Sequence, residues 1–213
     1  MNLQHSVGRR PRVGVLALQG GVAEHVRMLE SAGAQAVLVR RPAHLTDLDG
    51  IVLPGGESST IDRLLRLFGL ADPLRALITG GLPTLATCAG MVLLAEAIQD
   101  PAPDQQSLGI LPITVQRNAF GAQVVSEEAL VETVDGPVRA AFIRAPIVIE
   151  VGRDVEVTAR HRGRIVGVRR ADVTAISFHP ELTGDPTLHA QLVSRCRTRD
   201  DVAAPVVAVS DRR

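Results

Sequence analysis

The first half of the chain alternates short apolar runs with amphipathic segments of helical period. Near-continuous apolar runs at residues 13–18, 36–39 and 50–53 predict strands that are buried on both faces. Residues 22–32 and 61–68 repeat apolar positions every three or four residues, which predicts helices. Strands that alternate with helices in this way indicate an α/β fold built on a doubly wound, mostly parallel central sheet.

Turn and cap residues divide these elements. We expect Gly33 to close the first helix and Ser59 to cap the helix that follows the third strand. A short apolar strand and a turn of small residues within 82–90 then lead into the apolar segment 91–98. This segment predicts one further helix.

The second half of the chain consists mainly of short β-rich segments, which follow the polar, proline-bearing loop 101–106. They predict antiparallel strands appended to the parallel sheet. These segments are residues 113–116, 130–134, 140–143, 155–159, 165–168 and 173–178. A closing helix is expected at 188–197. The simplest organisation is one domain over residues 12–197, with residues 1–11 and 198–213 as flexible tails.

The composition excludes several classes of function. Of the 213 residues, 46% are hydrophobic and 22% are charged, as in ordinary globular proteins, and 23 Lys and Arg balance 23 Asp and Glu. This balance gives no electrostatic basis for nucleic-acid binding. No apolar run reaches the ~18 residues of a membrane span, and residues 1–11 lack the apolar region of a signal peptide. We therefore expect a cytoplasmic protein with neither a nucleic-acid nor a membrane partner.

The two cysteines, Cys88 and Cys196, are too few for a disulfide framework and favour a reducing compartment. Cys196 follows Leu188 and Leu192 at helical spacing, so we assign it to the core. Cys88 instead lies in the small-residue turn between a strand and a helix. The helix macrodipole and the free N–H groups there stabilise a thiolate, which makes Cys88 a candidate nucleophile.

A histidine and a carboxylate stand two residues apart in Phe178-His179-Pro180-Glu181. Alternate residues of an extended chain point the same way, and Pro180 favours that conformation at His179. With Cys88, these residues would form a Cys-His-Glu triad for acyl transfer. The simpler alternatives are a buried structural cysteine and a polar surface pair.

The glycine-rich turn at residues 54–58 follows the third predicted strand, at the edge where open α/β sheets bind ligands. Its glycines allow backbone N–H groups to point at a developing oxyanion. The N–H groups of Gly56 and Ala89 are therefore a candidate oxyanion hole. No Gly-Lys-Ser/Thr follows, so the turn is not a phosphate-binding loop.

Other polar residues carry weaker signals. Arg117 and Arg144 each end an apolar run and could bind a carboxylate bidentately, although the residues alone favour a surface position. We interpret Glu24-His25 as a solvated helix face rather than as a metal or base pair. The histidines and cysteines show no ligand spacing, so no metal is expected.

Together, these motifs resemble the glutaminase subunits of pyridoxal phosphate synthase, a family within the class I (triad) glutamine amidotransferases. Cys-Ala-Gly at 88–90 and His-x-Glu at 179–181 are shared by the whole class. The elements specific to the family are Leu-Gln-Gly at 18–20, Arg-Asn-Ala-Phe-Gly at 117–121 and Ile-Arg-Ala-Pro at 143–146. The resemblance covers residues 12–196.

The resemblance implies a flavodoxin-like amidotransferase fold and hydrolysis of L-glutamine to L-glutamate and ammonia through a thioester. It implies Cys88 as the nucleophile, His179 as the base and acid, and Glu181 as the group that orients His179. The glutamine contacts that it implies are Gly56, Glu57, Ser58, Arg117, Ile143 and Arg144. The ammonia would pass to a barrel-shaped synthase subunit in a hetero-oligomer that makes pyridoxal 5'-phosphate, so no cofactor is expected on this chain.

The chain departs from the family pattern at two places. Leu85-Ala86 stands where the family has an aromatic residue and glycine, and residues 125–128 differ from the usual Asp-Ser-Phe-Glu. These departures leave open a catalytically silent subunit that only binds and stabilises the synthase. A glutaminase subunit of another amidotransferase is a third interpretation, which the family-specific elements disfavour.

Overall fold

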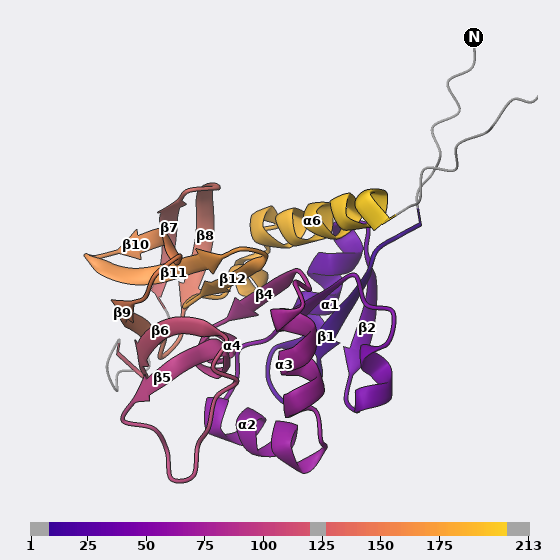
Figure 1. The fold of residues 1–213 in the computed structure, drawn as a ribbon. Coiled ribbons are helices and arrows are strands. Elements are labelled where there is room, and N and C mark those ends of the chain that lie inside the picture. Colours follow the sequence, from indigo (N-terminus) through magenta and orange to yellow (C-terminus); the bar gives the residue numbers. More distant parts are fainter. Residues whose placement is uncertain (1–8, 120–126, 204–213) are drawn as a thin grey trace, which may run out of the picture.

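The structure, a computed structural model, describes residues 9–119 and 127–203. Its twelve described strands form one sheet, in which a parallel part and an antiparallel part meet at β12 (Figure 1). The structure confirms the α/β fold with a mostly parallel central sheet and added antiparallel strands.

The parallel part has the strand order β2-β1-β3-β4-β12. Its strands are β1 (Arg12–Leu16), β2 (Gln35–Val39), β3 (Gly50–Leu53), β4 (Thr84–Thr87) and β12 (Val173–Ile176). All residues of β3, β4 and β12 are buried, as expected of strands covered on both faces. The runs predicted at 13–18, 36–39 and 50–53 are confirmed as β1, β2 and β3.

Helices cover both faces of the parallel strands. One face packs on α1 (Val22–Ser31) and α6 (Thr187–Ala203). The other packs on α2 (Ser58–Leu67), α3 (Ala71–Thr79), α4 (Ala89–Leu94) and the 3₁₀ helix η1 (Pro42–Leu45). Along β3, Ile51 and Leu53 belong to the second core and Val52 to the first, because successive side chains of a strand point to opposite faces.

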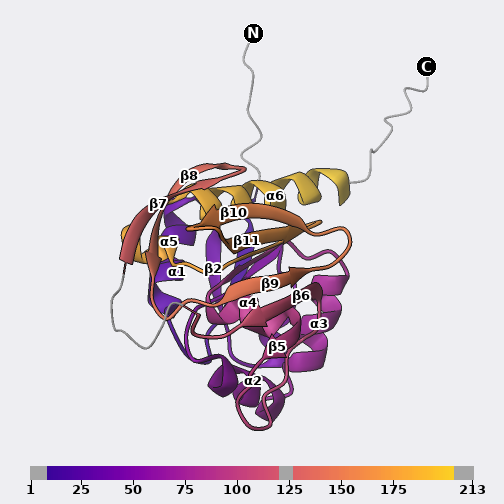
Figure 2. The ribbon, with the colours of Figure 1, turned by 90° about the vertical axis from the view of Figure 1, so that its left-hand side faces the viewer.

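The remaining strands extend to one side of the parallel sheet, as Figures 1 and 2 show, and they pair antiparallel except for β5 with β6. The path continues from β12 through β11 (Arg164–Arg170), β10 (Glu156–His161), β7 (Glu127–Thr133) and β8 (Gly136–Phe142). A branch leaves β11 through β9 (Ile147–Val151), β6 (Leu111–Gln116) and β5 (Ala95–Gln99). The short helix α5 (Pro180–Thr183) follows β12.

The helix expected over 91–98 is wrong in its second half. Helix α4 ends at Leu94, and Ala95–Gln99 forms strand β5. Strand β5 runs parallel to β6, with Ile98 opposite Val115. The apolar run changes from helix to strand because pairing with β6 satisfies its backbone. An apolar pattern does not reveal such a partner.

Two predicted caps are displaced. Glu57, not Ser59, is the N-cap residue of α2, and its carboxylate accepts a hydrogen bond from the Thr60 N–H at 3.0 Å. The C-cap of α1 is Ala32, and Gly33 follows it with a φ of 86°. The side chain of Glu57 is longer than that of serine but binds the same kind of free N–H group in the first turn. With Glu57 as the cap, α2 begins at Ser58.

The final helix is longer than expected. Residues 198–203, which we assigned to a tail, continue α6. Residues 1–8 and 204–213 of the expected tails, and the first two residues of the divergent segment 125–128, lie outside the described residues. Among the helices described, none has the length and apolar character to cross a membrane.

The contact between β3 and α6 gives a test of the packing. A Cβ atom at Gly50 would lie 2.5 Å from Sγ of Cys196, which is fully buried. Gly50→Ala should therefore lower the free energy of unfolding by about 1–3 kcal/mol through overpacking. In a denaturant-unfolding cycle, Gly50→Ala combined with Cys196→Ala should cost less than the sum of the single changes. Additive costs would contradict this contact.

Candidate active site

Cys88 occupies a strained turn between β4 and α4. Its backbone has a φ of 48° and a ψ of −104°, an unusual conformation for a residue other than glycine. Its N–H donates to the Ile176 carbonyl at 2.8 Å, which ties the turn to the end of β12. A Cβ atom at Gly90 would lie 2.2 Å from the Leu53 carbonyl oxygen, so only glycine lets α4 start this close to β3.

His179 and Glu181 reach this turn from the segment after β12. The His179 backbone pairs with Ala141 of β8, and its Nδ1 lies 2.6 Å from Oε1 of Glu181. The structure brings the two side chains together, as expected. The extended backbone that we expected to do this is not present at Glu181. Its backbone is not extended: Pro180 begins α5, and Glu181 lies in the first turn of that helix.

The charge of His179 follows from its two partners. Burial by itself lowers the pKa of His179, but hydrogen bonds with the side chains of Cys88 and Glu181 outweigh burial and raise the pKa to about 10. The imidazole is therefore cationic near neutral pH. It lies between the thiol and the carboxylate and contacts both.

The glycine-rich turn after β3 packs directly on His179. A Cβ atom at Gly55 would lie 2.2 Å from Cε1 of His179. The Gly55 N–H donates to Oγ1 of Thr87 at 2.9 Å, and the Gly55 carbonyl accepts from the Gly21 N–H at 3.2 Å. The peptide bond between Gly55 and Gly56 is trans, so its carbonyl and its N–H point in opposite directions. Because the Gly55 carbonyl faces Gly21, the Gly56 N–H is directed away from Gly21.

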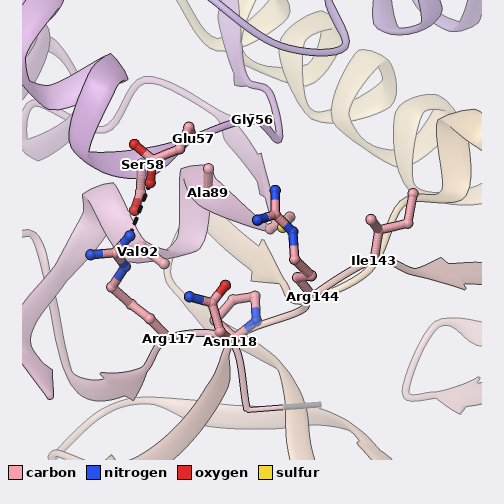
Figure 3. A pocket seen from close by; sticks show the side chains of 11 residues that line it. Gly56, Glu57, Ser58, Ala89, Val92, Arg117, Asn118, Ile143 and Arg144 are labelled. Carbon is pink, nitrogen blue, oxygen red and sulfur yellow. Dashed lines mark hydrogen bonds and ion pairs between the residues drawn. The ribbon is translucent and has the colours of Figure 1, made fainter. Parts of the chain in front are cut away.

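A pocket opens in front of Cys88 (Figure 3). It brings together every oxyanion and substrate residue expected from the sequence. Its lining consists of Gly56, Glu57, Ser58, Cys88, Ala89, Val92, Arg117, Asn118, Ile143, Arg144 and Pro146. The loops and helix starts after β3 and β4, and the loops after β6 and β8, supply these residues, so the pocket spans the parallel and the antiparallel parts of the sheet.

Glu57 and Arg117 form an ion pair across the pocket. Nη2 of Arg117 lies 2.9 Å from Oε1 of Glu57, as the dashed line in Figure 3 marks. Burial tends to raise the pKa of Glu57, but hydrogen bonds from Ser59 and Thr60 outweigh this and lower it. Glu57 thus presents a negative charge to the pocket while it caps α2.

A third polar residue holds this pair in place. Oε1 of Gln105 accepts a hydrogen bond from Nη1 of Arg117 at 2.7 Å, and its Nε2 donates to Oγ of Ser58 at 3.0 Å. Gln105 lies in the polar loop between β5 and β6. It therefore connects that loop to two residues of the pocket lining.

Arg144 differs from Arg117 in having no such pairing. It follows β8 with a φ of 44°, and its exposed side chain extends toward α4 in Figure 3. Within the described ranges, no carboxylate or carbonyl accepts a hydrogen bond from its guanidinium. The Arg144 charge is thus available to a ligand in the pocket.

The sequence interpretation missed several residues around the site. Gln19 accepts a hydrogen bond from the Glu57 N–H at 2.8 Å, and its place in the Leu-Gln-Gly element was the available signal. His25 is fully buried, so our interpretation of it as part of a solvated helix face is wrong. The signal was its spacing of four residues from Leu29, which puts both on the inner face of α1. Nothing in the sequence pointed to Gln105.

The described residues also bear on metal binding. No group of three or more His, Cys, Asp or Glu side chains in the described part of the chain is arranged to hold a metal ion.

The chain is similar to characterised proteins over most of its length. Residues 15–198 match the SNO glutamine amidotransferase family. The pyridoxal 5'-phosphate synthase subunit PdxT of Acidothermus cellulolyticus is 56% identical over 193 residues, covering 87% of this chain and 93% of the relative. The PdxT subunit of Kineococcus radiotolerans is also 56% identical, with coverages of 89% and 96%. A crystal structure of a glutamine amidotransferase matches with a TM-score of 0.81 and 44% identity, covering 87% of this chain and 98% of the matched chain.

The cationic state of His179 predicts a pH-dependent stability. Its pKa rises from 6.5 to about 10 on folding, so its contribution is fully present below pH 6.5 and is lost as the pH rises through about 10. We expect the difference in unfolding free energy between the wild type and His179→Gln to shrink over this interval. Denaturant unfolding at several pH values measures it, and a constant difference from pH 6 to 10 would contradict the assignment.

Proposed function

Because the chain belongs to the SNO glutamine amidotransferase family, we propose that it is the glutaminase of a pyridoxal 5'-phosphate synthase. It hydrolyses L-glutamine to L-glutamate and ammonia, and one domain over residues 12–197 carries this activity. The observation that supports the proposal most directly is the contact of His179 with both Cys88 and Glu181, behind a pocket with charged groups of both signs.

In the proposed first step, the Cys88 thiolate attacks the side-chain amide carbon of glutamine. The C–S bond forms as the carbonyl oxygen becomes an oxyanion, which the N–H groups of Gly56 and Ala89 stabilise. The tetrahedral intermediate collapses when His179 gives its proton to the amide nitrogen. Ammonia leaves, and a thioester between glutamate and Cys88 remains.

In the second step, water hydrolyses the thioester. The neutral His179 takes a proton from the attacking water, the C–S bond breaks, and glutamate leaves. Glu181 accepts a hydrogen bond from Nδ1 of His179 in both steps and stays ionised. Its role is to orient the imidazole and to stabilise the cation.

The charges in the pocket favour one orientation of glutamine. We assign the α-carboxylate to Arg144, which has no partner among the described residues, and the α-ammonium to Glu57. Arg117 holds Glu57 in place, Ser58 and Ile143 contact the rest of the substrate, and the amide end faces Cys88. Opposite charges at one end of the pocket select an amino acid over a simple amide.

Ala86 stands where the family has glycine. Its added methyl group does not obstruct the turn at Cys88, so this difference does not support a silent subunit. Ala86 lies within β4 rather than in the turn, opposite Leu53 on one side and Ala175 on the other. Its methyl group is fully buried in the core beneath α2, α3 and α4. The core accommodates the added methyl group without displacing Cys88 from the pocket.

We further propose that the glutaminase works in a hetero-oligomer with the synthase subunit, which receives the ammonia. The relatives in Acidothermus cellulolyticus and Kineococcus radiotolerans are named as subunits of the synthase, which supports this assignment. Both cysteines are free thiols, as is usual in the reducing cytoplasm, where we place the protein.

Replacement of the nucleophile tests the proposed reaction. Cys88→Ala should abolish release of glutamate from glutamine, measured alone and with the synthase subunit present. Cys196→Ala is the matched control because it removes the other buried thiol, and its turnover per folded molecule should equal that of the wild type. The wild type should be stimulated by the synthase subunit. A wild type that is inactive in both assays would instead support the silent subunit.

Replacement of Arg144 tests the orientation of the substrate. Arg144→Gln should raise the KM for glutamine by roughly tenfold or more, because a bidentate ion pair is lost, and should change kcat by less than about threefold. Arg160→Gln removes an exposed arginine of β10 outside the pocket and should change neither constant. An unchanged KM in Arg144→Gln would refute the assignment of the α-carboxylate.

A further inference from the structure

Two buried histidines lie next to the triad but outside the lining of the pocket. His25 of α1 and His189 of α6 are both fully buried, and neither lines the pocket or has a role in the reaction described above. Each ring nitrogen of a buried imidazole needs a hydrogen-bond partner. Their contacts lead directly to Glu181.

The contacts of His25 reach three different elements. Its Nδ1 lies 2.8 Å from Nε2 of His189, and its Nε2 lies 3.2 Å from Oγ1 of Thr87 and 3.5 Å from Oε1 of Glu181. Thr87 immediately precedes the nucleophile and also accepts the hydrogen bond from the Gly55 N–H. His25 therefore touches both the orienting carboxylate and the strand that carries Cys88.

Both histidines are neutral. Burial lowers the pKa of His25 to about 3, although the negative charge of Glu181 acts in the opposite direction. Burial likewise lowers the pKa of His189 to about 4, against a smaller opposing effect of Asp185. Each imidazole thus has one N–H and one lone pair, and its tautomer decides which nitrogen donates.

The carboxylate selects the tautomer. If Nδ1 of His25 carried the proton, the Nε2 lone pair would face Oε1 of Glu181 at 3.5 Å, which is repulsive. With the proton on Nε2, His25 donates to Oγ1 of Thr87 and presents the positive end of this N–H to the nearby Oε1 of Glu181, and its Nδ1 accepts from Nε2 of His189. Nδ1 of His189 is then an acceptor, and no donor among the described residues reaches it.

Glu181 has few other polar neighbours. Its Oε1 contacts Nδ1 of His179 and Nε2 of His25, whereas its Oε2 has no hydrogen-bond partner in the described part of the chain. The Glu181 side chain is 1% exposed, so its orientation depends on these two imidazoles. Loss of His25 would leave Glu181 free to rotate away from His179.

We propose that His25 is a positioning residue for the reaction, with His189 fixing its tautomer. The Nε2–H of His25 holds Glu181 in line with His179 and, through Thr87, fixes that carboxylate relative to Cys88 and the Gly55 turn. The inference rests on the proposed glutaminase function. Because His25 touches no residue that we assign to glutamine binding, it acts on kcat and leaves KM nearly unchanged.

Substitutions at position 25 separate this role from simple packing. His25→Leu fills similar space without an N–H, and we expect kcat for glutamine hydrolysis to fall about tenfold to a hundredfold, with KM within about twofold of wild type. His25→Gln can place an amide N–H near the position of Nε2, and its kcat should stay within about threefold of wild type. His44→Leu, at a histidine of η1 remote from the triad, is the matched control and should be unchanged.

A double-mutant cycle tests whether His25 acts through Glu181. If it does, His25→Leu combined with Glu181→Gln should lose no more kcat than Glu181→Gln alone. Multiplicative losses would overturn the proposal. Equal losses of kcat in His25→Leu and His25→Gln would also overturn the proposal, provided that both variants have the unfolding midpoint of the wild type.

If His25→Leu does not fold, His189→Leu and His189→Gln provide the same comparison. The leucine removes the donor to Nδ1 of His25 and should lower kcat by about threefold or more, whereas the glutamine can retain that donor. Equal kcat values in the two variants would overturn the proposal. The same assay also measures the wild type and Cys88→Ala. If the wild type turns over glutamine and Cys88→Ala does not, the proposed function holds whatever the histidine variants show.

Discussion

The site depends on the packing of the His179 ring against the backbone of Gly55. No side chain fits between them, because even a methyl group at position 55 would overlap the ring. The same glycine is held by Thr87 of β4 and by Gly21 at the start of α1. His179, the glycine-rich turn and the strand that leads to Cys88 therefore share a single fixed arrangement, set by backbone approach rather than by a flexible side chain.

Much of the fold could be predicted from the sequence because its parallel strands are short apolar runs bounded by clear turns. The prediction failed where a segment's conformation depends on a distant partner. Residues 95–99 are as compatible with a helix as with a strand until β6 is in place beside them. Strand β9 was missed altogether, although it pairs with both β6 and β11.

The candidate site was more predictable than its surroundings. Cys88, His179 and Glu181 stand in motifs whose residue types have a chemical reason, so the sequence alone indicated them, whereas Glu57 was indicated only by the family resemblance. Gln105 and His25 could not be assigned in this way, because their roles depend on what the fold places next to them. A glutamine in a polar loop and a histidine on an amphipathic helix are common in any chain.

The order of strands has a consequence for the protein during its synthesis. Strand β12, which lies between β4 and β11 in the sheet, is translated long after β4. Until it emerges from the ribosome, β4 is an open edge that other chains can pair with, and protection by chaperones is most valuable in that interval. His179 and Glu181 follow β12 directly, so an incomplete chain has a thiol without its base. In the proposed reaction, ammonia release therefore begins only after β12 and the segment that carries His179 and Glu181 have been translated.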